Sequence, residues 1–141
     1  MAFRDIWAFF GQIDPVTHHF SPKSWFAGHS PAVNTKATIT KAAAGANKRH
    51  VATSLTVSLT AGGTAPTANT VTVALIDGAS GGSTYLWGPH TIGIPAVAGA
   101  MNGFVVSLWA VGTANTAMTL EFSAAAGANT YESVSLEGTT V

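Results

Sequence analysis

The stretch His50–Leu59, HVATSLTVSL, decides the fold, because its side chains alternate in kind with a period of two. Successive side chains of an extended strand point to opposite faces of a sheet, so this pattern is typical of a strand with one buried face. The residues expected on the buried face are Val51, Thr53, Leu55, Val57 and Leu59. The strand predicts a sheet that needs a second layer to cover its apolar side.

Six further segments after residue 36 show the same alternation, two of them weakly. They are Ala37–Lys41, Thr70–Ile76, Thr84–Ile92, Gly103–Trp109, Ala117–Ser123 and Thr130–Leu136. Clusters of Gly and Asn separate them, and these residues supply the positive φ angles of tight turns. No helical pattern of ordinary length lies between the segments, which argues against parallel βαβ units. The sequence therefore predicts an all-β domain over residues 34–141, an antiparallel β-sandwich with jelly-roll-like strand order.

Residues 1–33 differ from the rest, with closely spaced aromatic residues and three prolines. The spacing of Ile6, Phe9, Phe10 and Ile13 favours a short helix near the start. The prolines that follow favour extended backbone. Because the segment is too short to form its own core, its aromatic side chains must dock elsewhere. We expect an N-terminal extended docking arm over residues 1–33, with these partner-binding candidates: Trp7, Phe9, Phe10, Trp25 and Phe26.

The charge content excludes several classes of function. Charged residues are 9% of the chain, six basic and six acidic, against about 25% in an average domain. Phosphate binding needs clustered Lys and Arg, so we expect no nucleic-acid partner. Near-zero net charge promotes association, which suggests an assembly. Gly78–Leu120 carries no charge, but Pro89 and Pro95 interrupt it, so we expect no membrane span.

The chain has no cysteine, so neither a disulfide nor a thiolate metal site is predicted. Its carboxylates are Asp5, Asp14, Asp77, Glu121, Glu132 and Glu137. A glycosidase needs two of them about 5–10 Å apart. Glu121 and Glu132 flank Gly127 on strands that we expect to pair as a hairpin. We interpret them as a surface pair rather than a catalytic one.

The histidines are His18, His19, His29, His50 and His90. Adjacent residues of an extended segment point to opposite sides, so His18 and His19 are poorly placed to chelate one ion. We interpret the histidines as surface or interface residues, and a metal on a symmetry axis stays open. Gly78–Gly82 connects two strand-like runs and has no helix N-terminus to cradle a phosphate. We therefore expect no catalytic residue, no metal and no cofactor, and hence no enzyme.

Three aromatic residues suggest an alternative. Tyr85, Trp87 and Trp109 could form a platform for sugar rings, because Tyr85 and Trp87 are expected on one face of a strand. Core or subunit-interface packing is the other interpretation. The alternative function is a glycan-binding module of a head fibre or tail tip used in host attachment.

One hexapeptide occurs twice, as Ala42–Asn47 and as Ala124–Asn129, each between two strands. A duplicated hairpin with a repeated contact role is one interpretation. The other, which we favour, is the same turn used twice in a chain rich in Ala and Gly.

Three stretches together resemble a known class: Lys48–Thr53 (KRHVAT), Val73–Gly82 (VALIDGASGG) before Leu86 and Trp87, and Ala117–Ser123 (AMTLEFS). They are similar to small β-sandwich proteins of tailed-bacteriophage virions, of the capsid cement or decoration type. The similarity covers roughly residues 37–141 and leaves the first 33 unmatched. That class brings no catalytic residues to carry over.

The resemblance implies a structural virion protein on the outer surface of the capsid. Its partner would be the major capsid protein, which it would bind so as to stabilise the head shell. It also implies a homo-oligomer, a trimer or else a dimer. The aromatic arm would then bury its Trp and Phe side chains on a neighbour, because aromatic residues are the usual anchors of interfaces.

Overall fold

The computed structural model describes residues 12–13, 20–21 and 23–141. Two short strands, β1 (Gln12–Ile13) and β2 (Phe20–Ser21), pair antiparallel with each other. The other strands are β3 (Lys23–His29), β4 (Thr38–Lys41), β5 (His50–Ala61), β6 (Thr70–Asp77), β7 (Tyr85–Gly93), β8 (Met101–Val111), β9 (Met118–Phe122) and β10 (Thr130–Thr140). The described part of the chain holds no helix with the length and apolar character to cross a membrane.

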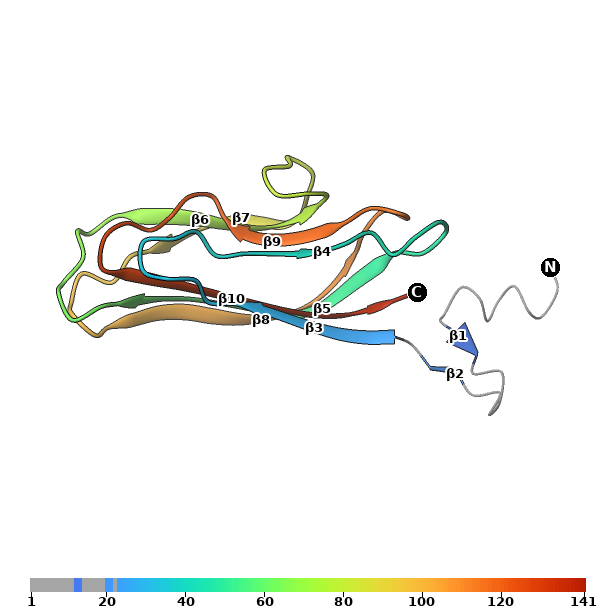
Figure 1. Ribbon diagram of the computed structural model, residues 1–141, viewed down its shortest axis with the longest axis horizontal. Coiled ribbons are helices and arrows are strands. Elements are labelled where there is room, and N and C mark those ends of the chain that lie inside the picture. The colour runs from blue at the N-terminus through green and yellow to red at the C-terminus, as the bar shows by residue number, and fades with distance from the viewer. Residues whose placement is uncertain (1–11, 14–19, 22) are drawn as a thin grey trace.

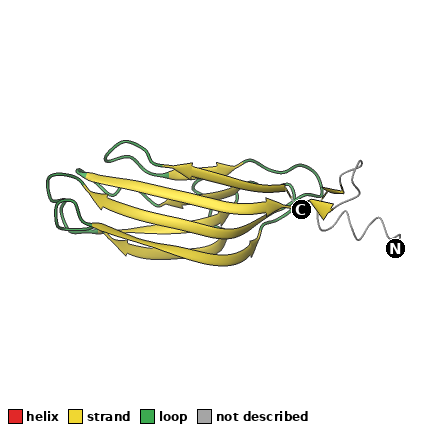
Figure 2. Ribbon diagram, turned by 90° about the horizontal axis from the view of Figure 1, so that it is seen from below, coloured by secondary structure: helices red, strands yellow, loops and turns green. Residues whose placement is uncertain are grey.

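Eight strands form two antiparallel sheets of four, ordered β3-β10-β5-β8 (the first sheet) and β4-β9-β6-β7 (the second sheet). The strand pairs are nested along the chain: β3 with β10, β4 with β9, β5 with β8, and β6 with β7. A long antiparallel hairpin rolled into two layers gives this nesting, which defines a jelly roll. Figures 1 and 2 show the two layers face to face. The predicted all-β sandwich with jelly-roll order is confirmed.

The core fills the space between the two sheets, and alternating residues of almost every strand contribute to it. Its largest fully buried apolar side chains are Phe122, Leu55, Leu59, Leu75, Met118, Leu120 and Leu136. Trp25, Trp87 and Phe104 are partly buried and pack against this cluster. Burial of apolar surface stabilises a fold by about 25 cal/mol for each Å² removed from water. The packed side chains of this core are therefore the main source of stability.

Strand β3 lies within residues 1–33, the predicted docking arm. It pairs antiparallel with β10 over its whole length, from Lys23 opposite Thr140 to His29 opposite Val134. Trp25 and Ala27 pack against the core, while Phe26 points outward and is 66% exposed. Residues from 23 onward therefore belong to the sandwich. Of the residues expected in a helix, Ile6, Phe9 and Phe10 lie outside the described residues and Ile13 is in β1.

The expected alternation of β5 is wrong at its first residues. The register of β5 shifts between Ala52 and Ser54, against both β8 and β10. The shift places Ala52 in the core cluster with Leu55, and Thr53 is only half-buried. An extra residue in a ladder reverses the faces of the residues beyond it. Val51 and Thr53 therefore do not continue the row formed by Leu55, Val57 and Leu59.

The repeated hexapeptide forms the same turn twice. Gly45 and Gly127 have φ angles of 102° and 103°, and Asn47 and Asn129 both have 61°. In each copy the glycine carbonyl accepts a hydrogen bond from the N–H three residues later, at 3.2 and 3.3 Å. Asn tolerates the left-handed conformation better than most residues. The favoured interpretation, one turn used twice, agrees with this geometry.

Candidate docking surface

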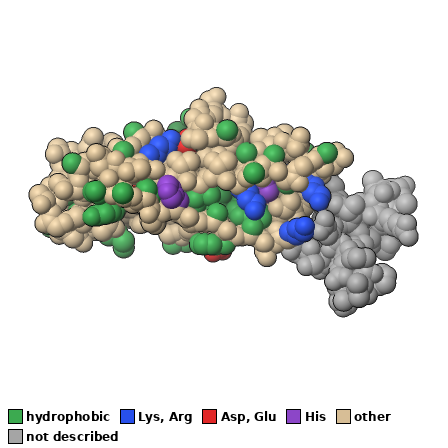
Figure 3. Space-filling view, viewed as in Figure 1, with side chains coloured by type: hydrophobic (Ala, Val, Ile, Leu, Met, Phe, Trp, Pro, Cys, Tyr) green, Lys and Arg blue, Asp and Glu red, His purple; other side chains and the backbone are tan. Residues whose placement is uncertain are grey.

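The outer face of the first sheet is almost uncharged. Its central strands β10 and β5 present small hydroxyl residues in register: Ser133 opposite Ser58, and Ser135 opposite Thr56. These two rows continue on β8 with Gly103 and Val105. Glu137 is the one charged residue that the described strands place on this face. We call this outer face of the first sheet the bare face. Figure 3 shows how few charged side chains lie over the body of the molecule as a whole in that view.

Large apolar side chains surround the hydroxyl rows. The exposed ones carried by the strands of the first sheet are Phe26, Met101, Val105, Trp109, Val111 and Tyr131. Trp109 is 73% exposed and Val105 is 69% exposed, both on β8. That strand is an edge of its sheet and contains neither a charge nor a proline. Long, apolar, unprotected edge strands are sites where another chain can pair or pack.

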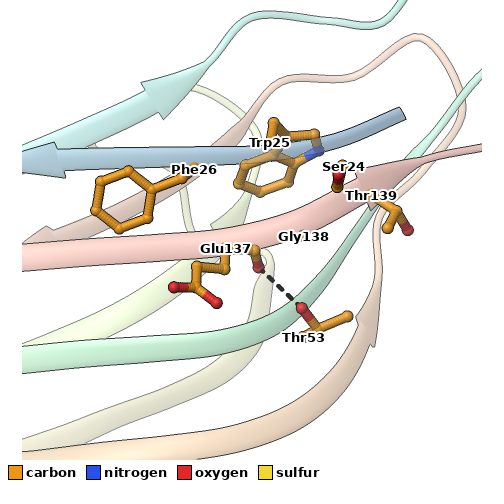
Figure 4. A pocket seen from close by; sticks show the side chains of 7 residues that line it. All are labelled: Ser24, Trp25, Phe26, Thr53, Glu137, Gly138 and Thr139. Carbon is orange, nitrogen blue, oxygen red and sulfur yellow. Dashed lines mark hydrogen bonds between the residues drawn. The ribbon is translucent and has the colours of Figure 1, made fainter. Parts of the chain in front are cut away.

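A shallow groove of about 370 Å³ lies at the other edge of the bare face, across β3, β10 and β5. Figure 4 shows its lining: Ser24, Trp25, Phe26, Thr53, Glu137, Gly138 and Thr139. Phe26 lies directly opposite Glu137 in the ladder. The Thr53 hydroxyl donates to the Glu137 carbonyl at 3.5 Å. The groove combines one exposed aromatic ring, one carboxylate and several hydroxyl groups.

Gly138 shapes this edge by letting Trp25 lie across β10 on the core side. A Cβ at Gly138 would lie 2.2 Å from the Val51 carbonyl oxygen and 2.6 Å from the Trp25 ring. Trp25 also contacts the His50 ring edge-on, with centroids 5.6 Å apart. Its indole N–H is buried without a hydrogen-bond partner among the described residues.

The candidate anchors of the docking arm fall into two groups. Trp7, Phe9 and Phe10 lie outside the described residues. Trp25 and Phe26 are neighbours on β3, but Trp25 faces the core and only Phe26 is free to meet a partner. The sequence singled out Phe26 and Trp109, two residues of the bare face, but did not bring them together on one surface. The consecutive apolar residues Val105 and Val106 were a further signal, because one of two neighbouring strand residues must point outward.

The structure does not bring the three glycan-binding candidates together. Trp87 packs against the core and lies 5.8 Å from the Phe104 ring, between centroids. Tyr85 is 48% exposed on the second sheet, and Trp109 belongs to the first. The register of β7 shifts so that Trp87 is opposite Leu75 and Tyr85 opposite Ile76. Because Leu75 and Ile76 point to opposite faces, so do Trp87 and Tyr85. The expectation of one shared face is corrected.

Part of the outer face of the second sheet is covered by the chain itself. The β6–β7 loop, residues 78–84, lies over this part and contacts the buried outward side chains Ile76, Thr119 and Glu121. The Gly81 N–H donates to Glu121 Oε1 at 2.8 Å, and the Ser80 hydroxyl donates to Oε2. Lys36 Nζ lies 2.8 Å from the same Oε2. We call this surface the covered face, and Figure 1 shows its loop rising above β6, β7 and β9.

This network determines the charge state of Glu121. Burial raises the pKa of the Glu121 carboxyl, but the hydrogen bonds from Lys36, Ser80 and Gly81 and the Lys36 charge outweigh it. The net pKa is below its ordinary value. A carboxylate held ionised in this way is a structural acceptor and a poor general acid. The Ser80 hydroxyl donates to this carboxylate, which is itself paired with Lys36.

Glu132 joins two connecting segments at one end of the sandwich. Its Oε2 accepts from the Ala37 N–H and its Oε1 from the Ala126 N–H, both at 2.6 Å. Burial raises the pKa of Glu132, and the two backbone hydrogen bonds offset only part of that rise. The expected hairpin between Glu121 and Glu132 is wrong, because β9 and β10 lie in different sheets. Both carboxylates are buried rather than on the surface.

The histidines of the described region have local partners. His50 is buried, with Nδ1 3.0 Å from the Thr140 hydroxyl and Nε2 2.8 Å from the Ala42 carbonyl. His29 Nδ1 accepts from the Thr38 N–H at 3.1 Å. His90 stacks on Trp87, while His18 and His19 lie outside the described residues. Between residues 23 and 141 no three His, Asp or Glu residues are grouped as metal ligands would be.

The chain has few detectable similarities to known proteins. No protein-family model matches the chain, and no curated protein matches it. Among solved structures, the tobacco streak virus coat protein matches over 83% of this chain and 86% of that chain. The two are 7% identical, and the TM-score is 0.34. At this score the likeness says nothing about what the present chain binds.

Proposed function

We propose that the chain is a structural virion protein, a decoration or cement protein of a tailed-bacteriophage capsid. It would sit on the outer surface of the head shell, bind the major capsid protein and stabilise the shell. The single observation that carries the proposal is the bare face, a sheet surface with six exposed large apolar side chains and one charged residue, Glu137, among the described strands. A monomer in water rarely leaves such a surface uncovered.

The jelly-roll topology supports the same proposal. Double-sheet jelly rolls are used both in viral capsid domains and in lectin domains. A fold by itself does not determine function, so the choice between a capsid role and a lectin role depends on the chemistry of the exposed surfaces. The ionisable groups buried in the described residues serve the fold: Glu121 fixes a loop, and Glu132 and His50 each hold a connecting segment. This arrangement favours a structural role over an enzymatic one.

The bare face is also suited to a second copy of the chain. Six apolar side chains with Glu137 as the one charged neighbour on the described strands match the composition of interface cores, where charged residues are depleted. We propose a homo-oligomer, with a trimer preferred over a dimer, in which part of the bare face contacts a neighbouring copy and the rest, including β8, contacts the shell. Size-exclusion chromatography with light scattering measures this state directly.

The test is binding to purified head shells. Full-length chain is sedimented with shells, and Trp109→Ala, on the bare face, is compared with Tyr85→Ala, on the second sheet. We expect at least tenfold weaker binding for Trp109→Ala and a change within twofold for Tyr85→Ala. Quantitative mass spectrometry of purified particles gives the copy number. Equal binding of both variants and the wild type contradicts the proposal, and so does a few copies per particle.

The contribution of the docking arm needs a shorter truncation than residues 1–33. Deleting 1–33 would remove β3 and expose the β10 edge. Deleting residues 1–22 leaves all eight strands of the two sheets in place. We expect this truncated chain to fold and to lose shell binding. Wild-type affinity after the deletion would show that the arm is not needed.

A second candidate function, glycan binding, is favoured by the groove beside Phe26. Flat aromatic rings stack on sugars, and the carboxylate of Glu137 and the hydroxyls of Ser24 and Thr139 could accept and donate hydrogen bonds there. On a glycan array, a signal that Phe26→Ala abolishes and Trp109→Ala retains would favour this candidate. An array without any signal would remove it.

A further inference from the structure

The positive charges of the sandwich are gathered at one end. Five of the six Lys and Arg residues lie in the described region, and four of them are at this end: Lys23, Lys41, Lys48 and Arg49. Figure 3 shows Lys and Arg side chains concentrated toward the end where β3 begins and β10 finishes. We call this surface the basic end.

The strand pairing places these four residues together. Lys23 is opposite Thr140 on β10, and Thr140 is opposite His50 on β5. Arg49 exchanges backbone hydrogen bonds with Val141, at 2.8 and 3.0 Å. Lys41 ends β4, with its Nζ 5.5 Å from the centre of the Trp25 ring. Three segments, the start of β3, the end of β4 and the residues just before β5, therefore bring the four cations to one surface.

The cations of the basic end have no carboxylate partner among the described residues. The ion pair found in that part of the chain is Lys36 with Glu121, which belongs to the covered face. Asp77 also lies toward this end, since it is opposite Met118, which pairs with Lys41. Its carboxylate accepts hydrogen bonds from the Thr113 N–H and hydroxyl, at 3.0 and 2.6 Å. Because the Thr113 donors are neutral, the described side chains of the basic end comprise four cations and one carboxylate, which leaves a positive excess.

Three loops at the opposite end, β5–β6, β7–β8 and β9–β10 (residues 62–69, 94–100 and 123–129), contain no Lys, Arg, Asp or Glu. That end also holds Glu132, which is buried against the Ala37 and Ala126 N–H groups, and Lys36, which is paired with Glu121. We call the three loops the uncharged end. Backbone hydrogen bonds join these loops, as from Gly62 to Asn129 and from Gly99 to Gly62. The two ends of the sandwich therefore differ in charge, and this difference could orient the molecule on a charged partner.

We propose that the basic end docks on an acidic protein surface. The chain has zero net charge, so it lacks the long-range attraction that draws basic proteins to a nucleic-acid polyanion. A compact group of cations without an ion pair among the described residues, on a molecule of zero net charge, instead suits a complementary acidic patch, which fixes orientation and register. The sandwich would then be oriented with the first residue of β3 next to the partner and the uncharged end away from it. That the partner surface is the head shell rests on the proposed function, whereas its acidic character does not.

The test uses full-length chain and poly-L-glutamate as the probe, with binding measured by calorimetry at low and at moderate salt. Lys48→Gln with Arg49→Gln removes two positive charges from the basic end. The matched control, Thr67→Glu with Ala98→Glu, adds two negative charges at exposed positions of the uncharged end. Both variants reach the same net charge. Unfolding curves confirm that each is folded, and Lys23→Gln with Lys41→Gln is a second variant of the basic end.

We expect the wild type to bind poly-L-glutamate more weakly as salt is raised. The Lys48 and Arg49 variant should bind at least tenfold more weakly, while the control stays within twofold of the wild type. Equal loss in both variants, or no binding by the wild type at low salt, overturns the inference. Tighter binding to a thymidine oligonucleotide or to phosphatidylglycerol vesicles than to poly-L-glutamate overturns it too. One outcome separates the two proposals. If the Lys48 and Arg49 variant loses affinity for poly-L-glutamate while the control keeps it, and yet no chain sediments with shells, the proposed function fails and the acidic-partner inference holds.

Discussion

The two outer faces of this sandwich differ although each belongs to a four-stranded antiparallel sheet. The covered face buries Glu121 and Thr119 under a loop of the same chain and satisfies them with hydrogen bonds. No loop among the described residues covers the bare face, and its outward residues are small hydroxyls bordered by exposed Trp109, Val105 and Phe26. The chain therefore covers part of one face with its own loop, and we propose that a partner covers the other.

The largest expected effect is loss of the covered face. Glu121→Ala removes the acceptor of the Gly81 N–H and the Ser80 hydroxyl and leaves Lys36 without its partner. Removing one member of a partly buried network should lower the free energy of unfolding by about 2–3 kcal/mol. Urea unfolding measures it, and proteolysis within residues 78–84 should become faster. A loss below about 0.5 kcal/mol, the range of ordinary surface substitutions, would contradict the network's role.

The next effect concerns the bare face and should appear in binding rather than in stability. Trp109 is 73% exposed, so Trp109→Ala should change the free energy of unfolding by no more than about 0.5 kcal/mol. Binding to the assembly should weaken at least tenfold, which corresponds to about 1.4 kcal/mol. Urea unfolding and shell sedimentation on the same preparation separate the two quantities. Destabilisation equal to that of Glu121→Ala would mean that the two faces do not differ.

A matched pair of hydroxyl deletions compares the faces more finely. Thr119 on the covered face donates to the Gly78 carbonyl at 2.7 Å, and its side chain is fully buried. Thr119→Val should therefore cost about 1 kcal/mol. Ser135→Ala on the bare face should stay within about 0.5 kcal/mol. Thermal unfolding of both variants provides the measurement, and equal losses would contradict the account.

The smallest effect is the expected change of the unfolding free energy with pH. It is small because the contributions of Glu121 and Glu132 to stability change with pH in opposite directions. The pKa of Glu121 is lowered in the folded state from its ordinary value of 4.5, so its stabilisation is present above that value and is lost as pH falls below it. The pKa of Glu132 is raised from the same value, so its contribution is present below 4.5 and is lost as pH rises through the folded-state pKa. Glu132→Gln should remove the part of the pH dependence above 4.5, and Glu121→Gln the part below it. Unfolding free energies measured from pH 3 to pH 7 test both signs, and unchanged profiles would contradict them.

Seven of the eight sandwich strands could be predicted from the sequence, because period-two alternation with β-branched residues is a local property. The missed strand, β3, has Trp25 facing the core and Phe26 facing outward. Large aromatic residues at adjacent positions hide the alternation, and neighbouring prolines made the segment resemble an arm. Strand order was predicted only as jelly-roll-like, because the nesting of β3 with β10 joins residues more than one hundred positions apart.

The candidate site was less predictable, since it depends on register and on which strands are edges. A shift at β7 separates Tyr85 from Trp87, and a shift at β5 moves Thr53 out of the core row. Neither shift has a signature in composition. Glu121 and Glu132 looked like surface residues because their burial comes from a loop and from chain connections that lie outside their own strands. The uncharged character of the chain, by contrast, was visible from its composition.

Hydroxyl-radical footprinting of the assembled particle tests the central claim most directly, because it reports the exposure of Trp, Met, Phe and Tyr side chains one by one. The free chain and the particle-bound chain are oxidised in parallel and compared by mass spectrometry. We predict strong protection of Met101 and Trp109 in the particle and none of Tyr85. Protection of Tyr85 with unchanged oxidation of Met101 and Trp109 would contradict the claim that the bare face is the surface buried in the assembly.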